Sequence, residues 1–385
     1  MNVCMVAYAF YEKDNRIRRY AEALAARGDR VDVVALRQPG QSLEGELKGV
    51  RIFRIQERVR NEVFPTTYLY RLLLFLLQSA AFLARRSFGI GKYDVIHVHS
   101  VPDFEVFSAL VPKLLGAKVI LDIHDIVPEF YMSKFHKSHD SLAFRLLVLV
   151  ERLSIAFSNH LIIANHIWHD RLISRSVKSE KCTTILNYPD LEIFRKGIGS
   201  QKDEKFRMTY PGSLNWHQGV DVAIRAFSKI ARKYPHAVFH IYGEGPERKA
   251  LEKLVTELGM EGCVQIRDSI PLEGIARIMG ESDAGIVPKR AASFGDEAFS
   301  TKILEFMAME VPVIASSTRI DRYYFDDSQI LFFRSEDEDD LAEKMEALIL
   351  DGDLRKRLVR NASEYIRVNN WDIKRQEYFS LLDAL

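Results

Sequence analysis

The chain has few cysteines and no dominant charge. Its 385 residues include three cysteines, Cys4, Cys182 and Cys263, which are widely separated and odd in number. They form neither a disulfide framework nor a metal-ligand cluster, and they are typical of a reducing cytosol. The 54 basic and 53 acidic residues give a net charge of +1, so no overall field favours nucleic acid as a partner. We therefore expect a cytoplasmic protein with no bound metal.

The sequence also lacks low-complexity tracts and internal repeats. Residues 1–10 are apolar without a preceding basic region, which is typical of a first core strand rather than a signal peptide. Hydrophobic residues make up 47% of the chain and charged residues 28%, the balance of a soluble globular protein. A chain of this length is expected to form two domains.

One leucine-rich segment, 68–86, lies in a basic region. Residues 1–95 carry 16 Lys and Arg against 10 Asp and Glu, a net of +6. Arg71 and Gln78 divide the segment into apolar runs that are too short to span a bilayer. The favoured interpretation is an amphipathic helix buried against a sheet. The alternative is a peripheral membrane contact with anionic lipid. The basic residues of that contact would be Arg58, Arg60, Arg85 and Arg86.

Short apolar strands alternate with helical stretches along the chain. Strands are expected at 3–9, 31–36, 50–55, 94–99, 118–123, 160–164 and 183–189. A polar segment at 195–205 follows, and strands are then expected at 206–210, 237–242, 264–267, 284–288, 311–316 and 330–333. Strands separated by helices of ten or more residues predict parallel βαβ units. The sequence thus predicts an α/β fold with two Rossmann-like doubly wound domains, at 1–195 and 206–370, and a final helix at 371–385.

Two glutamates eight positions apart lie at a loop-to-helix junction. Ser300 is the expected N-cap of a short helix over Thr301–Met309, and Pro312 prevents the helix from continuing. Glu297 precedes the cap, whereas Glu305 lies more than a turn into the helix. The N–H groups at the helix N-terminus form a site for phosphate. Each carboxylate can then hold hydroxyls at one end of a nucleotide sugar, with the diphosphate between them.

The stretch from Glu297 to Glu305 resembles the E-x7-E element of the family-four retaining glycosyltransferases, which have the GT-B fold of two Rossmann-like domains facing a cleft. The resemblance implies that Glu297 contacts the donor sugar and Glu305 the nucleotide ribose. It also implies that the final helix crosses back to an acceptor-binding first domain, while the second domain binds the nucleotide sugar. The remaining donor contacts that it implies here are Ala298, Phe299, Ser300 and Thr301.

Polar residues follow the expected strands of the first domain at their C-terminal tips. The resemblance implies that His124, after strand 118–123, is a catalytic residue that donates a hydrogen bond to a sugar hydroxyl. His97 is interpreted as a core residue. The family commonly has a Gly-Gly turn after the first strand, where this chain has charged side chains. We expect the acceptor to contact Asn15, Arg16, His99 and Asp125.

The run 210–221 aligns with the family pattern G-R-L…K-G-V-D through Gly212, Ser213 and Gln218. The Arg and Lys of the family neutralise the donor diphosphate, which is the leaving group, but Ser213 and Gln218 are neutral. Because stabilising a leaving group electrostatically is normally the largest catalytic term, another cation must replace them. The candidates are Lys289, which we assign to catalysis, Arg290, which we assign to donor binding, Lys302 and Arg16.

A glycine turn at Gly243 and Gly245 links a strand to a helix and matches the family's turn beneath the nucleotide. The acidic residue that a dinucleotide fingerprint requires further on is poorly matched, which argues against a nicotinamide oxidoreductase.

The sequence therefore predicts a retaining, metal-independent glycosyltransferase without a cofactor. It would move a hexose from a nucleoside-diphosphate sugar to an acceptor hydroxyl, on a lipid-linked or polysaccharide-precursor saccharide at the inner face of the membrane. The resemblance implies that the departing diphosphate helps to deprotonate that hydroxyl. Two alternatives remain: a catalytically weak sugar-nucleotide-binding protein, and a sugar-nucleotide epimerase on the same fold.

Overall fold

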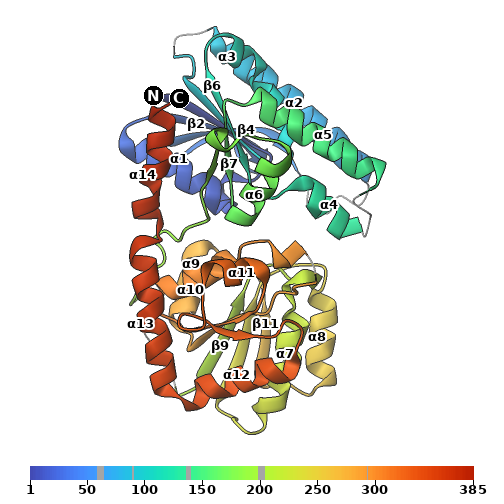
Figure 1. Cartoon of the computed structure of the whole chain (residues 1–385), viewed down its shortest axis with the longest axis vertical. Helices are drawn as coiled ribbons and strands as arrows, with labels where there is room; N and C mark the ends of the chain where they lie inside the picture. The colour runs from blue at the N-terminus through green and yellow to red at the C-terminus, as the bar shows by residue number, and fades with distance from the viewer. Residues whose placement is uncertain (59–64, 89–90, 136–139, 198–203, 293) are drawn as a thin grey trace. The chain divides into compact units, whose positions relative to one another are not determined.

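A computed structural model describes residues 1–58, 65–88, 91–135, 140–197, 204–292 and 294–385. Arg60 and most of the predicted polar segment 195–205 lie outside these residues. The described chain forms two compact α/β units (Figure 1). The first contains residues 1–187 and 374–385, and the second contains residues 188–373.

The first unit is built on an eight-stranded sheet. Its strands in spatial order are β3 (Glu44–Leu47), β4 (Val50–Glu57), β2 (Arg30–Arg37), β1 (Asn2–Ala7), β5 (Val95–His99), β6 (Lys118–Ile123), β7 (His160–Ile163) and β8 (Cys182–Thr184). Every adjacent pair is parallel except β3 and β4. The sequence did not predict β3, because that short edge strand contains a single apolar residue, Leu47.

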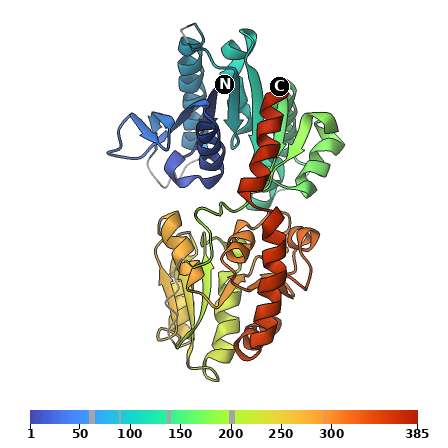
Figure 2. The same ribbon diagram turned by 90° about the vertical axis from the view of Figure 1, so that its left-hand side faces the viewer.

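Helices cover both faces of this sheet. They are α1 (Asn15–Arg27), α2 (Pro65–Ser87), α3 (Leu110–Leu114), α4 (Val127–Phe135), α5 (Leu142–Phe157), α6 (His166–Arg175) and α14 (Trp371–Asp383), with a 3₁₀ segment at Asp103–Ala109. Figure 1 shows α2 and α5 on one face of the sheet, where both contact the 3₁₀ segment, and α1 with α14 on the other face. Figure 2 marks both chain ends on this unit.

Helix α2 differs from its sequence-based interpretation in two respects. By length and composition, residues 66–87 are long and apolar enough to cross a membrane, contrary to the expectation that their apolar runs are too short. The helix is also not fully buried: one stripe, including Leu72, Phe75 and Leu83, packs on the unit, and the opposite stripe is exposed. A single helix of this kind is weak support for a membrane span, because core helices pass the same test.

The second unit has a six-stranded, all-parallel sheet. Its order is β11 (Val264–Arg267), β10 (Ala237–Tyr242), β9 (Phe206–Pro211), β12 (Ala284–Val287), β13 (Val313–Ser316) and β14 (Leu331–Phe333). Its helices are α7 (Val220–Ala231), α8 (Arg248–Glu257), α9 (Leu272–Gly280), α10 (Thr301–Ala308), α11 (Arg319–Tyr324), α12 (Glu338–Leu350) and α13 (Gly352–Val368). The two α/β sheets agree with the predicted fold class.

The chain passes from one unit to the other earlier than the predicted end of the first domain at 195. Strand β8 stops at Thr184, whereas the predicted strand continues to Pro189. Asn187 accepts hydrogen bonds from Arg16 and Arg19 of the first unit. At the other end of the chain, α14 returns to the first unit, where Tyr378 packs on Tyr20 with ring centroids 4.4 Å apart.

Each sheet reverses its strand order once, and a ligand crevice is expected at that point beyond the C-terminal strand ends. The reversal lies between β1 and β5 in the first sheet and between β9 and β12 in the second. Functional residues are therefore expected on the loops that follow these four strands.

Candidate functional site

A cavity of about 270 Å³ lies at the reversal point of the first sheet. The segments that follow β1, β5 and β6 supply most of its lining. Three of the predicted site residues line it, namely His99, His124 and Asp125. Asn15 is absent from the lining, where Asp14 is found instead. Asp14 also begins α1, because its carboxylate accepts the backbone N–H groups of Arg16 and Ile17, both at 3.1 Å.

Arg16 does not reach into this cavity for a ligand, which corrects the expectation from sequence. Its Nε and Nη2 atoms donate to the two carboxylate oxygens of Asp122, at 2.8 and 2.6 Å. Its Nη1 donates to the carbonyl of Ile185 and to Oδ1 of Asn187, both at 2.9 Å. Arg16 and Asp122 are both buried. The Arg16 guanidinium therefore lies in the core of the first unit, where it neutralises the carboxylate of Asp122 on β6.

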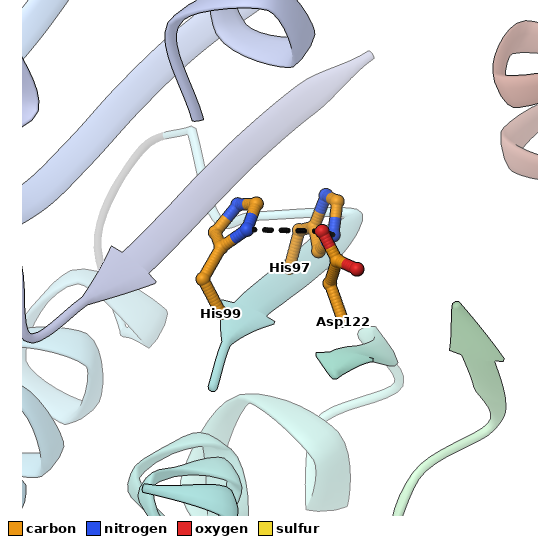
Figure 3. A group of neighbouring side chains, drawn as sticks. All are labelled: His97, His99 and Asp122. Atoms are coloured by element: carbon orange, nitrogen blue, oxygen red, sulfur yellow. Dashed lines mark ion pairs between the residues drawn. The ribbon is translucent and has the colours of Figure 1, made fainter. Parts of the chain in front are cut away.

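The histidines predicted from sequence gather around this carboxylate. Nδ1 of His99 and Nε2 of His124 each lie 3.3 Å from Oδ2 of Asp122, and these two ring nitrogens are 3.1 Å apart. Figure 3 shows the His99 ring directed at the carboxylate, with His97 beside it. Burial raises the pKa of Asp122, but Arg16 and then His124 outweigh it and hold the pKa well below its usual range. Asp122 is therefore ionised.

An ionised carboxylate accepts hydrogen bonds and donates none, so Asp122 orients His124. The ring nitrogen of His124 that faces Asp122 is Nε2, so Nδ1 lies on the side of the ring away from the carboxylate. The predicted hydrogen bond between His124 and a sugar hydroxyl would therefore be made through Nδ1.

His97, His99 and Asp122 also place potential metal-ligand atoms within 4.8 Å of one another. A metal ion here would share the carboxylate with the Arg16 guanidinium, and two cations on one buried carboxylate repel each other. Burial lowers the pKa of both His97 and His99, so the rings are neutral. The group is better explained as a hydrogen-bonded network that fixes His124.

In the second unit, the loop after β9 packs closely on α10. Gly212 has φ of 153°, and a Cβ there would lie 2.3 Å from Cε of Lys302, so a side chain would displace the lysine. The backbone N–H of Gly212 donates to the carbonyl of Tyr242 at 2.8 Å. Behind it, a Cβ on Gly243 would lie 1.8 Å from the carbonyl oxygen of Gly212, and Gly245 is similarly close to Leu214. The glycine turn predicted beneath the nucleotide therefore supports the loop.

Two of the predicted diphosphate cations are already neutralised. Nζ of Lys289 lies 2.9 Å from Oδ2 of buried Asp321 and donates to the carbonyl of Ala298 at 2.8 Å. This corrects the assignment of Lys289 as the catalytic cation, because its charge is balanced and its bond positions the loop before α10. Arg290 is likewise paired with both carboxylate oxygens of Asp221, at 3.0 and 2.7 Å. Arg290 also contacts Glu336 at 2.9 Å.

Lys302 lies at the same junction with different partners. Its Nζ is 3.4 Å from Oε1 of Gln218 and 5.4 Å from the ring centroid of Tyr210. Tyr210 donates its hydroxyl to the carbonyl of Ser213 at 2.8 Å and to Gln218 Oε1 at 3.2 Å. Burial lowers the pKa of Lys302 to about 8, against the opposing effect of Glu305, and Lys289 lowers it further. Within the described residues, no carboxylate forms an ion pair with this ammonium group.

Ser300 occupies the N-cap position of α10, as predicted, but its side chain does not cap the helix. Its Oγ is buried and has no hydrogen-bond partner in the part of the chain that the structure describes. Buried hydroxyls are normally satisfied, and a helix N-terminus attracts anions. The N-terminus of α10, with Thr301 as its first residue and Ser300 before it, therefore has the features of a phosphate site.

The two glutamates lie on either side of this N-terminus. Oε1 of Glu297 is 3.0 Å from Nη1 of Arg319, an exposed residue of α11 that the sequence reasoning did not consider. Glu305 is partly buried, one turn beyond Lys302 on α10. Phe299 packs in an aromatic cluster, with its ring centroid 5.0 Å from Tyr324 and 6.2 Å from Phe325. The cluster fixes the loop that carries Glu297.

Each α/β unit has a mainly parallel sheet with polar residues at the point where the strand order reverses. This arrangement is typical of two-domain proteins that bind nucleotides. Comparison with known proteins identifies the family. A model of the glycosyl transferase 4-like domain matches residues 14–187, and a model of the glycosyl transferases group 1 matches residues 192–365. The chain belongs to the group 1 glycosyltransferases and has their GT-B fold.

Relatives with curated names agree with this family. An uncharacterised glycosyltransferase of Methanocaldococcus jannaschii is 26% identical over 326 residues, which are 77% of this chain and 74% of that protein. The sulfoquinovosyl transferase SQD2 of Arabidopsis thaliana is 23% identical over 371 residues, or 93% of this chain and 67% of that protein.

Solved structures show the same fold. A sucrose-phosphate synthase from Thermosynechococcus elongatus superposes with a TM-score of 0.78 at 19% identity and full coverage of both chains. The Anabaena protein HepE, solved in complex with UDP-glucose, superposes with a TM-score of 0.74 at 15% identity, also with full coverage of both chains.

Proposed function

We propose that the protein is a retaining glycosyltransferase that moves a hexose from a nucleoside-diphosphate sugar to an acceptor hydroxyl. The observation that carries this proposal is the junction around α10, where a helix N-terminus and the unsatisfied Ser300 hydroxyl lie between two glutamates. The family supports a sugar-nucleotide donor, as do related folds solved with UDP and UDP-glucose.

The role of each residue follows from its place at this junction. Glu297 would position the donor hexose and Glu305 the ribose, with the diphosphate at the N-terminus of α10. Glu297 exchanges its exposed ion pair with Arg319 for sugar hydroxyls at little cost, because such pairs contribute about 0–1 kcal/mol. His124, oriented by Asp122, would form a hydrogen bond with a sugar hydroxyl through Nδ1.

The proposed reaction balances without an added cofactor. The bond between the anomeric carbon and the diphosphate oxygen breaks, and a bond to the acceptor oxygen forms on the same face of the sugar. The acceptor's proton passes to the departing diphosphate. Charge that develops on the diphosphate is stabilised by preorganised donors at the helix N-terminus, the kind of interaction that contributes most in such sites.

The acceptor is proposed to be a saccharide linked to a lipid or destined for a polysaccharide. Support comes from the exposed face of α2 and α5, which we call the leucine face. Its large apolar side chains are between 45% and 73% exposed: Leu69, Tyr70, Leu73, Leu77, Leu142, Leu146, Leu149 and Leu153. The charged residues of both helices are arginines except for Glu151, which is buried and bound to Arg175. Apolar stripes flanked by arginines fit an anionic lipid surface.

A donor screen tests the proposed transfer. UDP-, GDP-, ADP- and TDP-sugars are assayed for thermal stabilisation and for hydrolysis of the donor without acceptor. We expect one nucleotide to raise the melting temperature selectively and one of its sugars to be hydrolysed slowly, with the α-anomer released or transferred. Binding without hydrolysis or transfer to any acceptor would favour the catalytically weak binding protein. An epimerised donor sugar would favour the epimerase.

Vesicle co-sedimentation tests the membrane contact separately. We expect binding to vesicles that contain anionic lipid, and weaker binding when Leu77 and Leu146 are both replaced by Ser. Replacement of Leu350, which is 66% exposed on the second unit, by Ser provides the matched control. Equal binding by all three proteins would contradict the role of the leucine face.

A further inference from the structure

The loop after β9 brings no cation to the phosphate site of the second unit. Ser213 and Gln218, which stand at its two ends, are neutral. The two basic residues after β12 are paired, Lys289 with Asp321 and Arg290 with Asp221. A departing diphosphate carries negative charge that a neutral loop cannot balance, so a cation is needed from another element.

Three separate features place Lys302 in that position. Its side chain extends from the first turn of α10, an eight-residue helix, to the Gly212 backbone, where a Cβ would lie 2.3 Å from its Cε. Its ammonium group lies 3.4 Å from Oε1 of Gln218. Close by in sequence, Ser300 leaves a buried hydroxyl without a partner among the described residues. A lysine without an ion-pair partner and a hydroxyl without a hydrogen-bond partner, both judged among the described residues, lie at one helix N-terminus, and these are the features of an anion site.

We propose that Lys302 is the catalytic cation that binds the donor diphosphate, delivered from α10 in place of a basic residue on the loop after β9. Gln218 is its positioning residue. Its carbonyl oxygen accepts hydrogen bonds from both Lys302 and Tyr210, which holds the ammonium group over Gly212. This inference rests on the proposed function and assigns the leaving-group contact within it.

The groups around Lys302 favour a lysine whose protonation becomes complete when the donor binds. The titratable groups that act on it are Glu305 of the same helix, Lys289 after β12 and Asp321 of α11. His217, in the 3₁₀ turn before α7, lies in the field of both lysines, and its pKa is lowered first by burial and then by them. Burial lowers the pKa of Lys302 to about 8, and a bound diphosphate would raise it.

Three variants test the proposal: Lys302→Met, Lys302→Arg, and the swap Lys302→Met with Gln218→Lys. The swap returns an ammonium group to nearly the same place from the opposite side, because Gln218 and Lys302 are adjacent. Lys253→Met is the matched control, since Lys253 is exposed on α8 and pairs only with Glu257 among the described residues. Calorimetry measures binding of inorganic pyrophosphate, and of the nucleoside and nucleoside diphosphate selected by the donor screen.

We expect Lys302→Met to weaken pyrophosphate and nucleoside-diphosphate binding at least tenfold while nucleoside binding changes less than twofold. In transfer assays, we expect kcat to fall roughly a hundredfold or more, the range for loss of one transition-state donor. Lys302→Arg and the swap should each bind pyrophosphate and the nucleoside diphosphate more tightly than Lys302→Met does. Each should recover at least a tenth of the affinity that Lys302→Met loses relative to wild type. Unchanged pyrophosphate affinity in Lys302→Met, or an equal loss of nucleoside binding, would overturn the proposal.

The outcomes separate this inference from the proposed function. If the wild-type protein binds pyrophosphate through Lys302 but no nucleotide, the anion site is upheld and the glycosyltransferase proposal fails. If it binds and transfers from a nucleotide sugar with Lys302→Met unaffected, the function is upheld and Lys302 is rejected. If it binds neither pyrophosphate nor any nucleotide, both are rejected. The melting temperature of each variant shows whether it is folded.

The pH dependence of binding adds a further readout. In wild-type protein the affinity for pyrophosphate should fall as pH rises above about 8, because unliganded Lys302 then loses its proton. Lys302→Arg should remain flat over the same range, since arginine stays charged. A flat wild-type profile between pH 7 and 9.5 would contradict the role of Lys302.

Discussion

The hydroxyl of Tyr378 lies 2.8 Å from Nδ1 of His97, which joins the last helix of the chain to the central strand β5. Burial raises the pKa of Tyr378 well above its usual range and lowers that of His97, so the phenol donates and the neutral ring accepts. Next to His97 lies Asp122, the carboxylate that orients His124. The final helix therefore packs directly on the hydrogen-bonded network behind the cavity of the first unit.

Tyr378→Phe should destabilise the first unit by about 1–3 kcal/mol, because Nδ1 of a buried ring loses its partner. Urea denaturation followed by circular dichroism measures the change. Tyr70→Phe is the control, since Tyr70 is 65% exposed on α2. Nucleotide binding should be the same in both variants, and an unchanged midpoint for Tyr378→Phe would show that the hydrogen bond contributes nothing.

Lys289→Met should lower activity mainly because it lowers the stability of the folded protein. The substitution leaves the buried carboxylate of Asp321 without its counter-ion, at a cost of about 3–5 kcal/mol. The double variant Lys289→Met with Asp321→Asn removes both charges and should regain much of the lost stability and activity. If Lys289 were instead the cation for the diphosphate, the double variant would stay inactive. Thermal unfolding and transfer rates measured together distinguish the two roles.

The stability of the first unit should fall as pH rises through neutrality. Burial raises the pKa of Glu105 to about 8 and that of Asp103 to about 7. Between the usual carboxyl pKa and these values, the folded state holds more protons than the unfolded chain, so each pH unit costs up to about 1.4 kcal/mol per carboxyl.

Glu105→Gln tests this pH dependence. Glu105 accepts a hydrogen bond from Ser79 of α2, and the amide can keep that bond without ionising. We expect the slope of unfolding free energy against pH, measured in urea at pH 5, 6, 7 and 8, to be shallower in the variant. A slope identical to that of wild type would mean that Glu105 is ionised in the folded protein.

Glu297→Ala and Glu305→Ala should affect different steps. Glu297→Ala should reduce transfer at least a hundredfold, about 3 kcal/mol, while nucleoside-diphosphate affinity stays within threefold. Glu305→Ala should weaken nucleoside-diphosphate binding itself. Arg319→Met removes the ion-pair partner of Glu297 and should change either quantity only a few-fold. Losses of only a few-fold in both glutamate variants would contradict their assigned roles.

The fold was predictable because its strands are short apolar runs between helical stretches. Strands β10 and β11 have the predicted bounds. Helix α11 was missed because Arg319–Tyr324 is short and largely polar, although Thr318 caps it through a hydrogen bond to the N–H of Asp321. The spacing of apolar residues identifies a helix or strand only when the element is long enough for that spacing to repeat.

The neighbours of the candidate site residues were harder to predict than the places of these residues in the fold. Sequence placed Lys289, Arg290 and Lys302 near the diphosphate, but the acids that neutralise the first two come from distant positions, Asp321 and Asp221. Pairing of this kind cannot be read from spacing along the chain.

Asp122 was also overlooked, although one signal for it was present. A charged residue inside the apolar run Lys118–Ile123 requires a buried partner. Arg16, on the first turn of α1, is that partner.

The return of α14 to the first unit has a practical consequence for dissection of the protein. The first unit is not a single continuous piece of sequence, since it needs residues 374–385 as well as 1–187. A fragment that stops at 187 would leave Tyr20 and His97 without the aromatic ring that covers them. Expression of the first unit alone therefore calls for a redesigned chain in which the last helix is joined by a linker to Asn187.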